Sequence, residues 1–418
     1  MIREVLVTDP IAGATDLDYD PTSPEVLADP LPAYETLRAQ CPVHLFEGLE
    51  HPLYTLSRLE DVHAQLSDPE LWSNRFGPGI SYSEQNPGSL QRYDPPEHTL
   101  RRRFLREPFL PKAVEAFQPA VSELAASLID GFESRGQAEL HDDYASPLPI
   151  TAFTRLLGLP LDDRPQFKYW AEKLTLGMTY PDQATDDWLA LRTYTLAKVR
   201  ARRDAMAAAD LGLEDDPVGT VVPEGLLSHL ACHRLGDGNF ATDDEVTGLV
   251  AMMLVAGHET TTSLVTNTVW RLLEDRTRWE RLLAEPDLVP NVIEESLRFD
   301  PPVLGDCRTN TAPVTIHGVD IPANSKVMHL LRSANHDPDL CEAPDEFRMD
   351  RPLLENRKHY AFGWGTHFCL GAHLARMTAR TALGQLIVRL PDLRLDGPTE
   401  RLQAPFLWGR RVLPVAWS

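Results

Sequence analysis

The stretch 362–371, FGWGTHFCLG, places a single thiol, Cys369, among three glycines. Glycines let a backbone turn tightly and approach another group closely. A thiolate that ligates a metal needs backbone N–H groups directed at its sulfur, and a loop of this composition can supply them. A helical pattern begins directly after Cys369, so the positive end of a helix would lower the pKa of the thiol. The pattern predicts a metal ligand, with a structural cysteine in a glycine turn as the alternative.

The type of metal follows from what surrounds Cys369. No second cysteine or histidine lies nearby at the spacing of a structural zinc site. A single thiolate suits a metal that other atoms already hold, as iron is held in haem. A second conceivable metal site is HLACH (229–233), with His229, Cys232 and His233. That motif has no evident fourth ligand, and a helix face explains its spacing.

Composition limits the class of partner. The 418 residues carry a formal net charge of −22, which argues against nucleic acid or an anionic membrane surface as the main partner. Five irregularly spaced cysteines form no disulfide framework and predict a reducing, cytoplasmic location. The first residues lack a signal-peptide pattern. The longest apolar run, 249–257, is about half of a membrane span, so we expect no membrane partner.

Helical periodicity dominates the middle of the chain. Amphipathic patterns at 113–132 and 187–209 are the clearest. The segment 242–275 reads as one long helix, and Thr242 and Glu245 have capping-box spacing at its start.

Short strand patterns lie outside this helical region. VTIHGVDIP (314–322) predicts a hairpin around Gly318. The patterns together predict a mainly α fold with small β-sheets (α+β). We expect an N-terminal extension over 1–28 and a single domain over 29–418.

The stretch FGWGTHFCLGAHLAR (362–376) resembles the haem-binding signature of the cytochromes P450, F-G-x-G-x-H-x-C-x-G-x-x-L-A-R, at every fixed position. The resemblance implies the cytochrome P450 fold, a single domain that binds haem b, and Cys369 as the thiolate ligand of the iron. Such a thiolate pushes electron density onto the iron and favours O–O cleavage. It also implies that Phe362 packs beside the sulfur and that Gly371 contacts the haem.

A polar interruption, AGHETT (256–261), lies in the middle of the long helix. In an ordinary helix Thr260 would bond back to the carbonyl of Ala256, with Glu259 at a solvated kink. The segment also resembles the family's oxygen-activation motif, [AG]-G-x-[DE]-T. That resemblance implies haem between the long helix and the cysteine loop, a helix that opens there, and Ala256 against the haem. Glu259 would relay protons, and Thr260 would hydrogen-bond the bound oxygen.

Haem carries two propionates that need cationic partners. His98 and Arg102 in DPPEHTLRRRF (94–104) lie one helical turn apart and match the family's H-x-x-x-R motif. Arg308 and His367 match its other propionate ligands. Asp306 matches a position that can lie near a propionate.

EESLR (294–298) puts Glu295 and Arg298 on one helix face. The pair resembles the family's E-x-x-R motif, completed by Arg351. The resemblance implies a buried structural role, holding the cysteine loop.

The resemblance implies a haem-thiolate monooxygenase that inserts one oxygen atom from O2 into a small, mostly hydrophobic substrate, by hydroxylation or oxidative O-demethylation. No flavin or iron–sulfur module is visible in the sequence, so electrons from NAD(P)H would arrive through a separate reductase and a [2Fe–2S] ferredoxin. The expected ferredoxin-docking patch is Arg101, Arg103, Arg106, Lys112, Arg357 and Lys358. The expected substrate contacts are Phe76, Ile80, Tyr82, Met178, Met253, Val303 and Leu304.

Two alternatives stay open at this point. A peroxygenase that uses hydrogen peroxide directly would have no need of the Glu259–Thr260 proton relay. A non-catalytic haem-thiolate ligand sensor would be favoured by an added signalling or DNA-binding domain, and the sequence shows none.

Overall fold

The computed structural model describes residues 17–82, 89–177, 184–209, 215–236, 238–402, 404 and 406–418. These residues form two compact units. The described parts of 1–83, 277–369 and 400–411 form unit 1, and those of 84–276, 370–399 and 412–418 form unit 2. Each unit combines segments that lie far apart in the sequence. The predicted boundary between an N-terminal extension and a domain at residue 29 stays a prediction.

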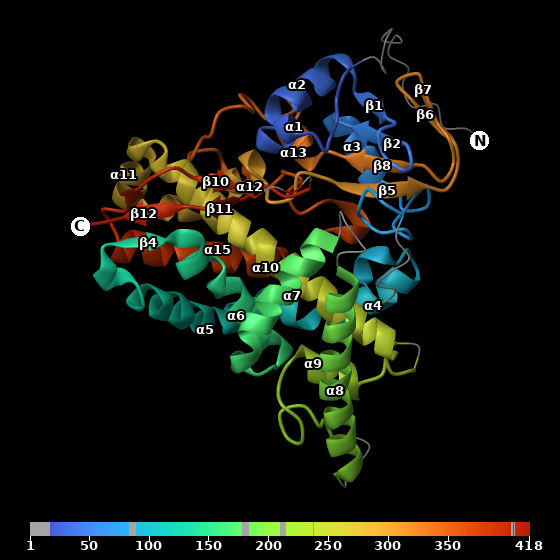
Figure 1. The fold of residues 1–418 in the computed structure, drawn as a ribbon, viewed down its shortest axis with the longest axis vertical. Coiled ribbons are helices and arrows are strands. Elements are labelled where there is room, and N and C mark those ends of the chain that lie inside the picture. Colours follow the sequence, from blue (N-terminus) through green and yellow to red (C-terminus); the bar gives the residue numbers. More distant parts are fainter. Residues whose placement is uncertain are drawn as a thin grey trace. The chain divides into compact units, whose positions relative to one another are not determined.

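Unit 2 is mainly helical (Figure 1). Its helices are α4 (Glu97–Leu105), α5 (Pro111–Asp130), α6 (Pro147–Leu157), α7 (Arg164–Gly177), α8 (Thr185–Ala208), α9 (Leu226–Cys232), α10 (Asp243–Leu273) and α15 (Ala372–Arg389), with a π-helical turn at His141–Ala145. An antiparallel sheet has the order β4 (Gln137–Glu139), β12 (Pro414–Ala416), β9 (Arg394–Leu395). The predicted helices at 113–132 and 187–209 are confirmed as α5 and α8.

Helix α10 is the centre of unit 2. It begins at the predicted capping box: the Thr242 hydroxyl accepts from the Glu245 amide at 3.2 Å, and the Glu245 carboxylate accepts from the Thr242 amide at 2.8 Å. Arg101 of α4 donates to the same carboxylate at 2.9 Å. Helices α6, α7, α8 and α15 pack against α10, so it is buried along most of its length.

Unit 1 combines short helices with a mixed sheet. Its helices are α1 (Pro24–Ala28), α2 (Leu31–Gln40), α3 (Leu59–Ser67), α11 (Arg276–Ala284, whose first residue belongs to unit 2), α12 (Val289–Phe299), α13 (Leu331–Asn335) and α14 (Leu353–Asn356). The five-stranded sheet has the order β1 (Val43–Phe46), β2 (Leu53–Leu56), β8 (Lys326–His329), β5 (Asp306–Asn310), β3 (Trp72–Ser73). Strands β2 and β8 are parallel and the other pairs are antiparallel. Two short strands, β10 (Glu400–Arg401) and β11 (Arg410–Val412), pair separately.

The hairpin predicted around Gly318 is confirmed as β6 (Val314–Ile316) and β7 (Val319–Ile321). Its two turn residues, His317 and Gly318, have φ of 48° and 80°. Two successive residues at positive φ match the right-handed twist of the strands, and glycine is the usual second residue.

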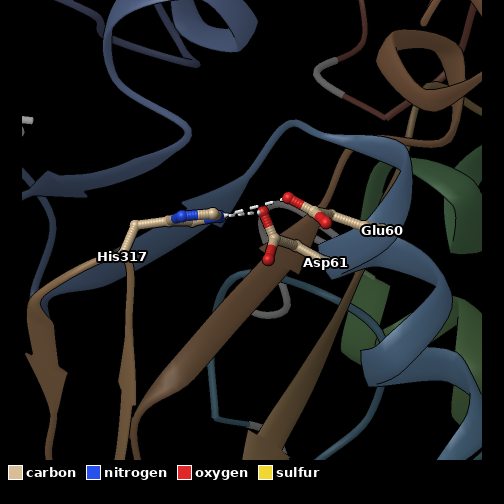
Figure 2. Close-up of side chains that lie close together, drawn as sticks. All are labelled: Glu60, Asp61 and His317. Atoms are coloured by element: carbon tan, nitrogen blue, oxygen red, sulfur yellow. Dashed lines mark hydrogen bonds and ion pairs between the residues drawn. The ribbon is translucent and has the colours of Figure 1, made fainter. Parts of the chain in front are cut away.

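The His317 side chain reaches across to the start of α3 (Figure 2). Its Nε2 lies 2.9 Å from Asp61 Oδ2 and 3.8 Å from Glu60 Oε1. The hydrogen bond to Asp61 raises the pKa of His317, burial opposes this, and Arg58 also lowers it. Imidazole and carboxylates are also ligand types for a divalent cation. The hydrogen bond is sufficient to explain the grouping, so we interpret it as an ion pair that fastens the hairpin to α3.

A buried carboxylate organises the region around α12. Glu295 accepts two hydrogen bonds from Arg298, both at 2.9 Å, and a third from Arg351 Nε at 3.1 Å. The two guanidinium groups also donate to backbone carbonyls at Asn335, Glu342, Ala343, Pro344 and Glu346. All three side chains are at most 6% exposed. The network therefore ties α12 to the coil of 335–351, and the predicted buried, structural character of this trio is confirmed.

The predicted fold class, mainly α with small sheets, is confirmed. No helix in the described part of the chain is both long and apolar enough to cross a membrane.

We expect the pKa of His317, measured by NMR titration, to lie above 6.5, because Asp61 stabilises the imidazolium. Since the folded pKa exceeds the unfolded one, the stabilisation is complete below about pH 6.5 and is lost as pH rises through the folded value. Asp61→Asn should clearly lower the midpoint of the His317 titration, that is, its pKa. Glu60→Gln is the control and should lower it less, because Glu60 is 70% exposed and farther away. Equal effects of the two variants would contradict the ion pair with Asp61.

We expect Glu295→Ala to lower the free energy of unfolding by about 3–5 kcal/mol, because it leaves two guanidinium groups buried without their carboxylate. The matched control is Glu285→Ala, which breaks the 3.3 Å pair of Glu285 with Arg281, whose side chains are 54% and 41% exposed. That change should cost less than about 0.5 kcal/mol. Denaturant unfolding of the three proteins measures both values. Similar losses in the two variants would show that the buried network is not the source of stability.

Candidate haem site and family

The cysteine loop is closed by its own backbone. The Cys369 amide donates to the Phe362 carbonyl at 2.9 Å. Gly363 and Gly365 take the left-handed conformation, with φ of 67° and 68°. A Cβ on Gly365 would lie 2.4 Å from the carbonyl oxygen of Leu66 at the end of α3. Gly363 and Gly365 are therefore required by their left-handed backbone conformation. Gly365 is required for a second reason, because it packs directly on the backbone of Leu66.

Cys369 differs from the cysteines buried in the core. Burial raises the pKa of the Cys41 thiol to about 11 and that of Cys307 to about 12, and it also raises the pKa of Cys232. A raised pKa disfavours the thiolate, which is the form that binds metals. Cys369 is partly exposed in its loop, so it is better placed than these three to present sulfur to a ligand.

The chain that leads into the loop is firmly anchored. His359 Nε2 lies 3.2 Å from Glu294 of α12, and both side chains are fully buried. The Tyr360 amide donates to Asn335 at 2.6 Å. Trp364, a large residue for a haem loop, packs its ring 5.3 Å from His63 and 5.9 Å from Tyr360. These contacts fix the loop from the side of α12 and of α3.

Three basic residues of unit 1 surround the Asp306 carboxylate. Arg308 Nη1 lies 2.6 Å and His329 Nε2 lies 3.0 Å from Asp306 Oδ1. Burial disfavours the charged form, but Arg308, then His329 and also His367, outweigh it and hold the pKa of Asp306 far below its usual range. The structure thus brings the predicted propionate ligands Arg308 and His367 to one place. Sequence reasoning missed His329, which only the antiparallel pairing of β5 with β8 places opposite Asp306.

One strip of α10 is exposed within an otherwise buried helix. Ala256 is exposed, and Met252, Val255 and Thr260 are partly exposed, whereas most of the other residues of α10 are buried. Spacings of three and four residues place these side chains on one face. The predicted oxygen-activation residue Thr260 therefore lies on the accessible face of α10, together with Ala256.

The AGHETT segment stays helical. Residues 256–260 are α-helical without interruption, so the expected opening of the helix is not seen. The Thr260 hydroxyl donates to the Ala256 carbonyl at 2.5 Å, as the ordinary-helix interpretation predicts. That interpretation is wrong for Glu259, which is only 8% exposed instead of solvated. A buried acid directly before an accessible hydroxyl keeps Glu259 a candidate for chemistry.

The first predicted propionate pair lies on α4. His98 is 1% exposed in the first turn, and Arg102 is partly exposed one turn later. The predicted spacing of one helical turn is confirmed. Arg101 points elsewhere, to Glu245 and over the Tyr93 ring at 4.2 Å.

The predicted substrate contacts fall into separate groups. In unit 1, Ile80 and Leu304 belong to one hydrophobic cluster, and the Phe76 and Tyr82 rings are 5.5 Å apart. Val303 pairs with Leu407. Met178 lies outside the described residues. Met253 is 3% exposed within the core of unit 2. Its neighbours Met252 and Val255 are more accessible than Met253 for such a contact.

The donor set of each unit fits haem. Unit 1 offers a partly exposed thiol for iron in the same loop as His367, and the guanidinium of Arg308, a group suited to a carboxylate. Unit 2 offers a helix face where the exposed residue is the small Ala256, beside Thr260, together with the His98–Arg102 pair. These are the residue types that a metal with an attached dicarboxylate requires.

The sequence matches the cytochrome P450 family model over residues 227–391. It is 32% identical to the cytochrome P450 monooxygenase PikC of Streptomyces venezuelae over 411 residues, 96% of this chain and 94% of PikC. It is also 32% identical to the steroid C26-monooxygenase of Mycolicibacterium smegmatis over 399 residues, 92% of each chain. The fold resembles the structure of cytochrome P450 PksS from Bacillus subtilis with a TM-score of 0.84 at 26% identity, covering 96% of this chain and 100% of PksS.

The similarities to the three relatives extend over more than nine-tenths of the chain and agree with the cysteine loop, so both the predicted fold and the predicted cofactor are confirmed. Members of this group use haem b and O2 and take electrons from NAD(P)H through redox partners. The chain therefore belongs to the cytochrome P450 family and is a haem-dependent monooxygenase.

Proposed function

We propose that this monooxygenase inserts one oxygen atom into a small, mostly hydrophobic substrate, by hydroxylation or oxidative O-demethylation. The observation that carries the proposal is the position of Thr260 on the accessible strip of α10, directly after the buried Glu259. An accessible hydroxyl beside a buried acid suits controlled proton delivery. The need for controlled proton delivery distinguishes a monooxygenase, which starts from O2, from a peroxygenase, which starts from hydrogen peroxide, where the oxygen is already reduced and protonated.

Within unit 1, Cys369 would ligate the haem iron, with Phe362 and Gly371 of the same stretch against the haem. Arg308 and His367 would hold a propionate in competition with Asp306, and His329 would extend that set. Bound haem supplies the iron at which O2 is activated. The loop's role is to present one sulfur in a fixed geometry, which the Cys369–Phe362 backbone hydrogen bond and the packing of Gly365 support.

Within unit 2, His98 and Arg102 would bind a propionate and Ala256 would lie against the haem. Thr260 donates to the Ala256 carbonyl in this structure, so its oxygen lone pairs are left to accept a hydrogen bond. Rotation of the hydroxyl would turn its hydrogen from the Ala256 carbonyl toward the accessible side of α10, where it would donate a hydrogen bond, while the helix keeps its backbone bonds. Glu259 would relay protons.

The substrate contacts would come from Phe76, Ile80, Tyr82, Val303 and Leu304 in unit 1 and from Met252, Val255 and Met253 in unit 2. Most of these side chains are apolar, and the Tyr82 hydroxyl already donates to the Asn324 carbonyl. This composition supports a mostly hydrophobic compound. The steroid named for one relative is of this chemical type.

Electrons would come from NAD(P)H through a ferredoxin reductase and a [2Fe–2S] ferredoxin. A ferredoxin is acidic and so is this chain, so docking requires local basic residues. Arg103, Arg106 and Lys112 are exposed in unit 2, and Arg357 and Lys358 are exposed in unit 1. Arg101 is less suitable, because it is committed to Glu245.

The thiolate assignment is tested by the absorption spectrum of the reduced protein under carbon monoxide. Wild type should show a strongly red-shifted Soret band, because a thiolate donates electron density to the iron. Cys369→Ser should lose that shift. Cys341→Ser is the control, a partly exposed cysteine of the same unit outside the loop, and should keep it. An unshifted wild-type band would exclude Cys369 as thiolate ligand and favour a ligand sensor.

The proton-delivery role is tested with Thr260→Ala in an assay with NADH, reductase and ferredoxin. We expect product per NADH to fall several-fold and hydrogen peroxide to rise, because O2 is reduced without productive proton delivery. Thr262→Val is the matched control, since its hydroxyl is fully buried and donates to the His258 carbonyl, at 2.9 Å. Equal coupling in Thr260→Ala and wild type would remove Thr260 from the mechanism. Wild-type turnover that needs peroxide but no ferredoxin would favour the peroxygenase.

A further inference from the structure

We propose that Ser146 and His258 are positioning residues that fix the rotation of α10 about its axis at Glu259 and Thr260. In this way they set the coupling of the enzyme, that is, the product formed per NADH consumed. The inference rests on the proposed role of Thr260. It concerns a contact between α10 and the start of α6, both within unit 2.

The contact is a hydrogen bond between two buried side chains. His258 Nε2 lies 3.0 Å from Ser146 Oγ. His258 is 1% and Ser146 is 0% exposed. A polar pair at this depth is held in place, because water cannot substitute for either partner. The residue directly before Glu259 is thus bonded to a different element.

Ser146 is itself fixed on both sides. Its amide donates to the His141 carbonyl at 2.8 Å, which closes the π-helical turn, and α6 begins at the next residue. A hydroxyl at the junction of two helical turns has little freedom to follow a movement of α10. It therefore serves as a stationary reference point.

The residue before His258 also packs against α6. A Cβ on Gly257 would lie 2.1 Å from Cε2 of Phe153, so the Phe153 ring rests directly on the backbone of α10. Gly257 thus allows α6 to approach α10 closely, and the hydrogen bond of His258 to Ser146 specifies the rotation of α10 about its axis. Packing alone would leave rotation less determined, because a ring on a bare backbone has no directional bond.

The position of His258 relative to the accessible strip makes the contact mechanically important. Each helical residue turns by about 100°, so His258 is about 200° from both Ala256 and Thr260, nearly opposite. A rotation of about 10° moves a hydroxyl about 5 Å from the axis by about 1 Å. Displacements of that size at a reacting centre can change rates by orders of magnitude. A contact on the rear face can therefore control Thr260 without touching it.

The test compares variants on both sides of the contact. Ser146→Ala and His258→Leu remove the hydrogen bond, whereas His258→Gln keeps a group that can donate or accept. We expect product per NADH to fall at least threefold in the first two and to recover in His258→Gln. In the resting, haem-loaded protein, amide hydrogen exchange in a peptide covering 254–262 should be faster in the first two. Exchange involves no turnover, so it reports on the helix independently of activity.

Thr154→Val is the matched control. Thr154 lies on α6, is 0% exposed, and its hydroxyl donates to a carbonyl of the same helix, that of Ile150, at 2.7 Å. It should leave both coupling and exchange at 254–262 unchanged. The proposal is overturned if Ser146→Ala keeps coupling within twofold of wild type, or if Thr154→Val uncouples equally. Thr260→Ala, run alongside, separates the two hypotheses: if it does not uncouple, the proposed role of Thr260 fails first.

Discussion

The carboxylate of Glu295 is the constraint on which unit 1 depends. A single buried anion is shared by two arginines, and the remaining donors of those arginines hold carbonyls between Asn335 and Glu346. Coil of this length would otherwise need its own hydrogen-bonding partners. The neighbouring acid, Glu294, bonds His359 and thereby reaches the start of the cysteine loop. Glu294 and Glu295, adjacent residues of α12, thus organise the backbone that leads to Cys369. Of Cys41, Cys232, Cys307 and Cys369, it is Cys369 that is suited to bind iron.

In unit 2 the central helix α10 meets two opposing requirements. The helix must be apolar enough to form the centre of the unit and still carry an acid and a hydroxyl in its middle. It separates these requirements by face: the Ser146–His258 bond holds the rear, Phe153 packs on the flank at Gly257, and the front exposes Ala256 and Thr260. Thr260 and Thr262 satisfy their hydroxyls on carbonyls four residues earlier, so these two polar groups are added with their donors paired.

Local chemistry made much of this predictable from the sequence. The capping box at Thr242, the turn at Gly318 and the tight turn of the cysteine loop at its glycines depend on neighbours in the chain, and all three are seen. Contacts set by strand pairing or helix rotation were not predictable in this way. His329 meets Asp306 only through the register of β5 and β8. Met253 is only 3% exposed, whereas Met252, one residue and hence about 100° away around α10, is partly exposed.

The order of segments within the two units has a consequence for synthesis of the protein. In unit 2, β4 at Gln137–Glu139 pairs with β12 at Pro414–Ala416, and in unit 1, β2 lies beside β8, about 270 residues later. Neither sheet can close on the ribosome while its first strand alone has emerged. Pairing over such separations is slow, and unpaired strand edges favour association with other chains. The early strands must therefore be kept apart from other chains until their distant partners have been made.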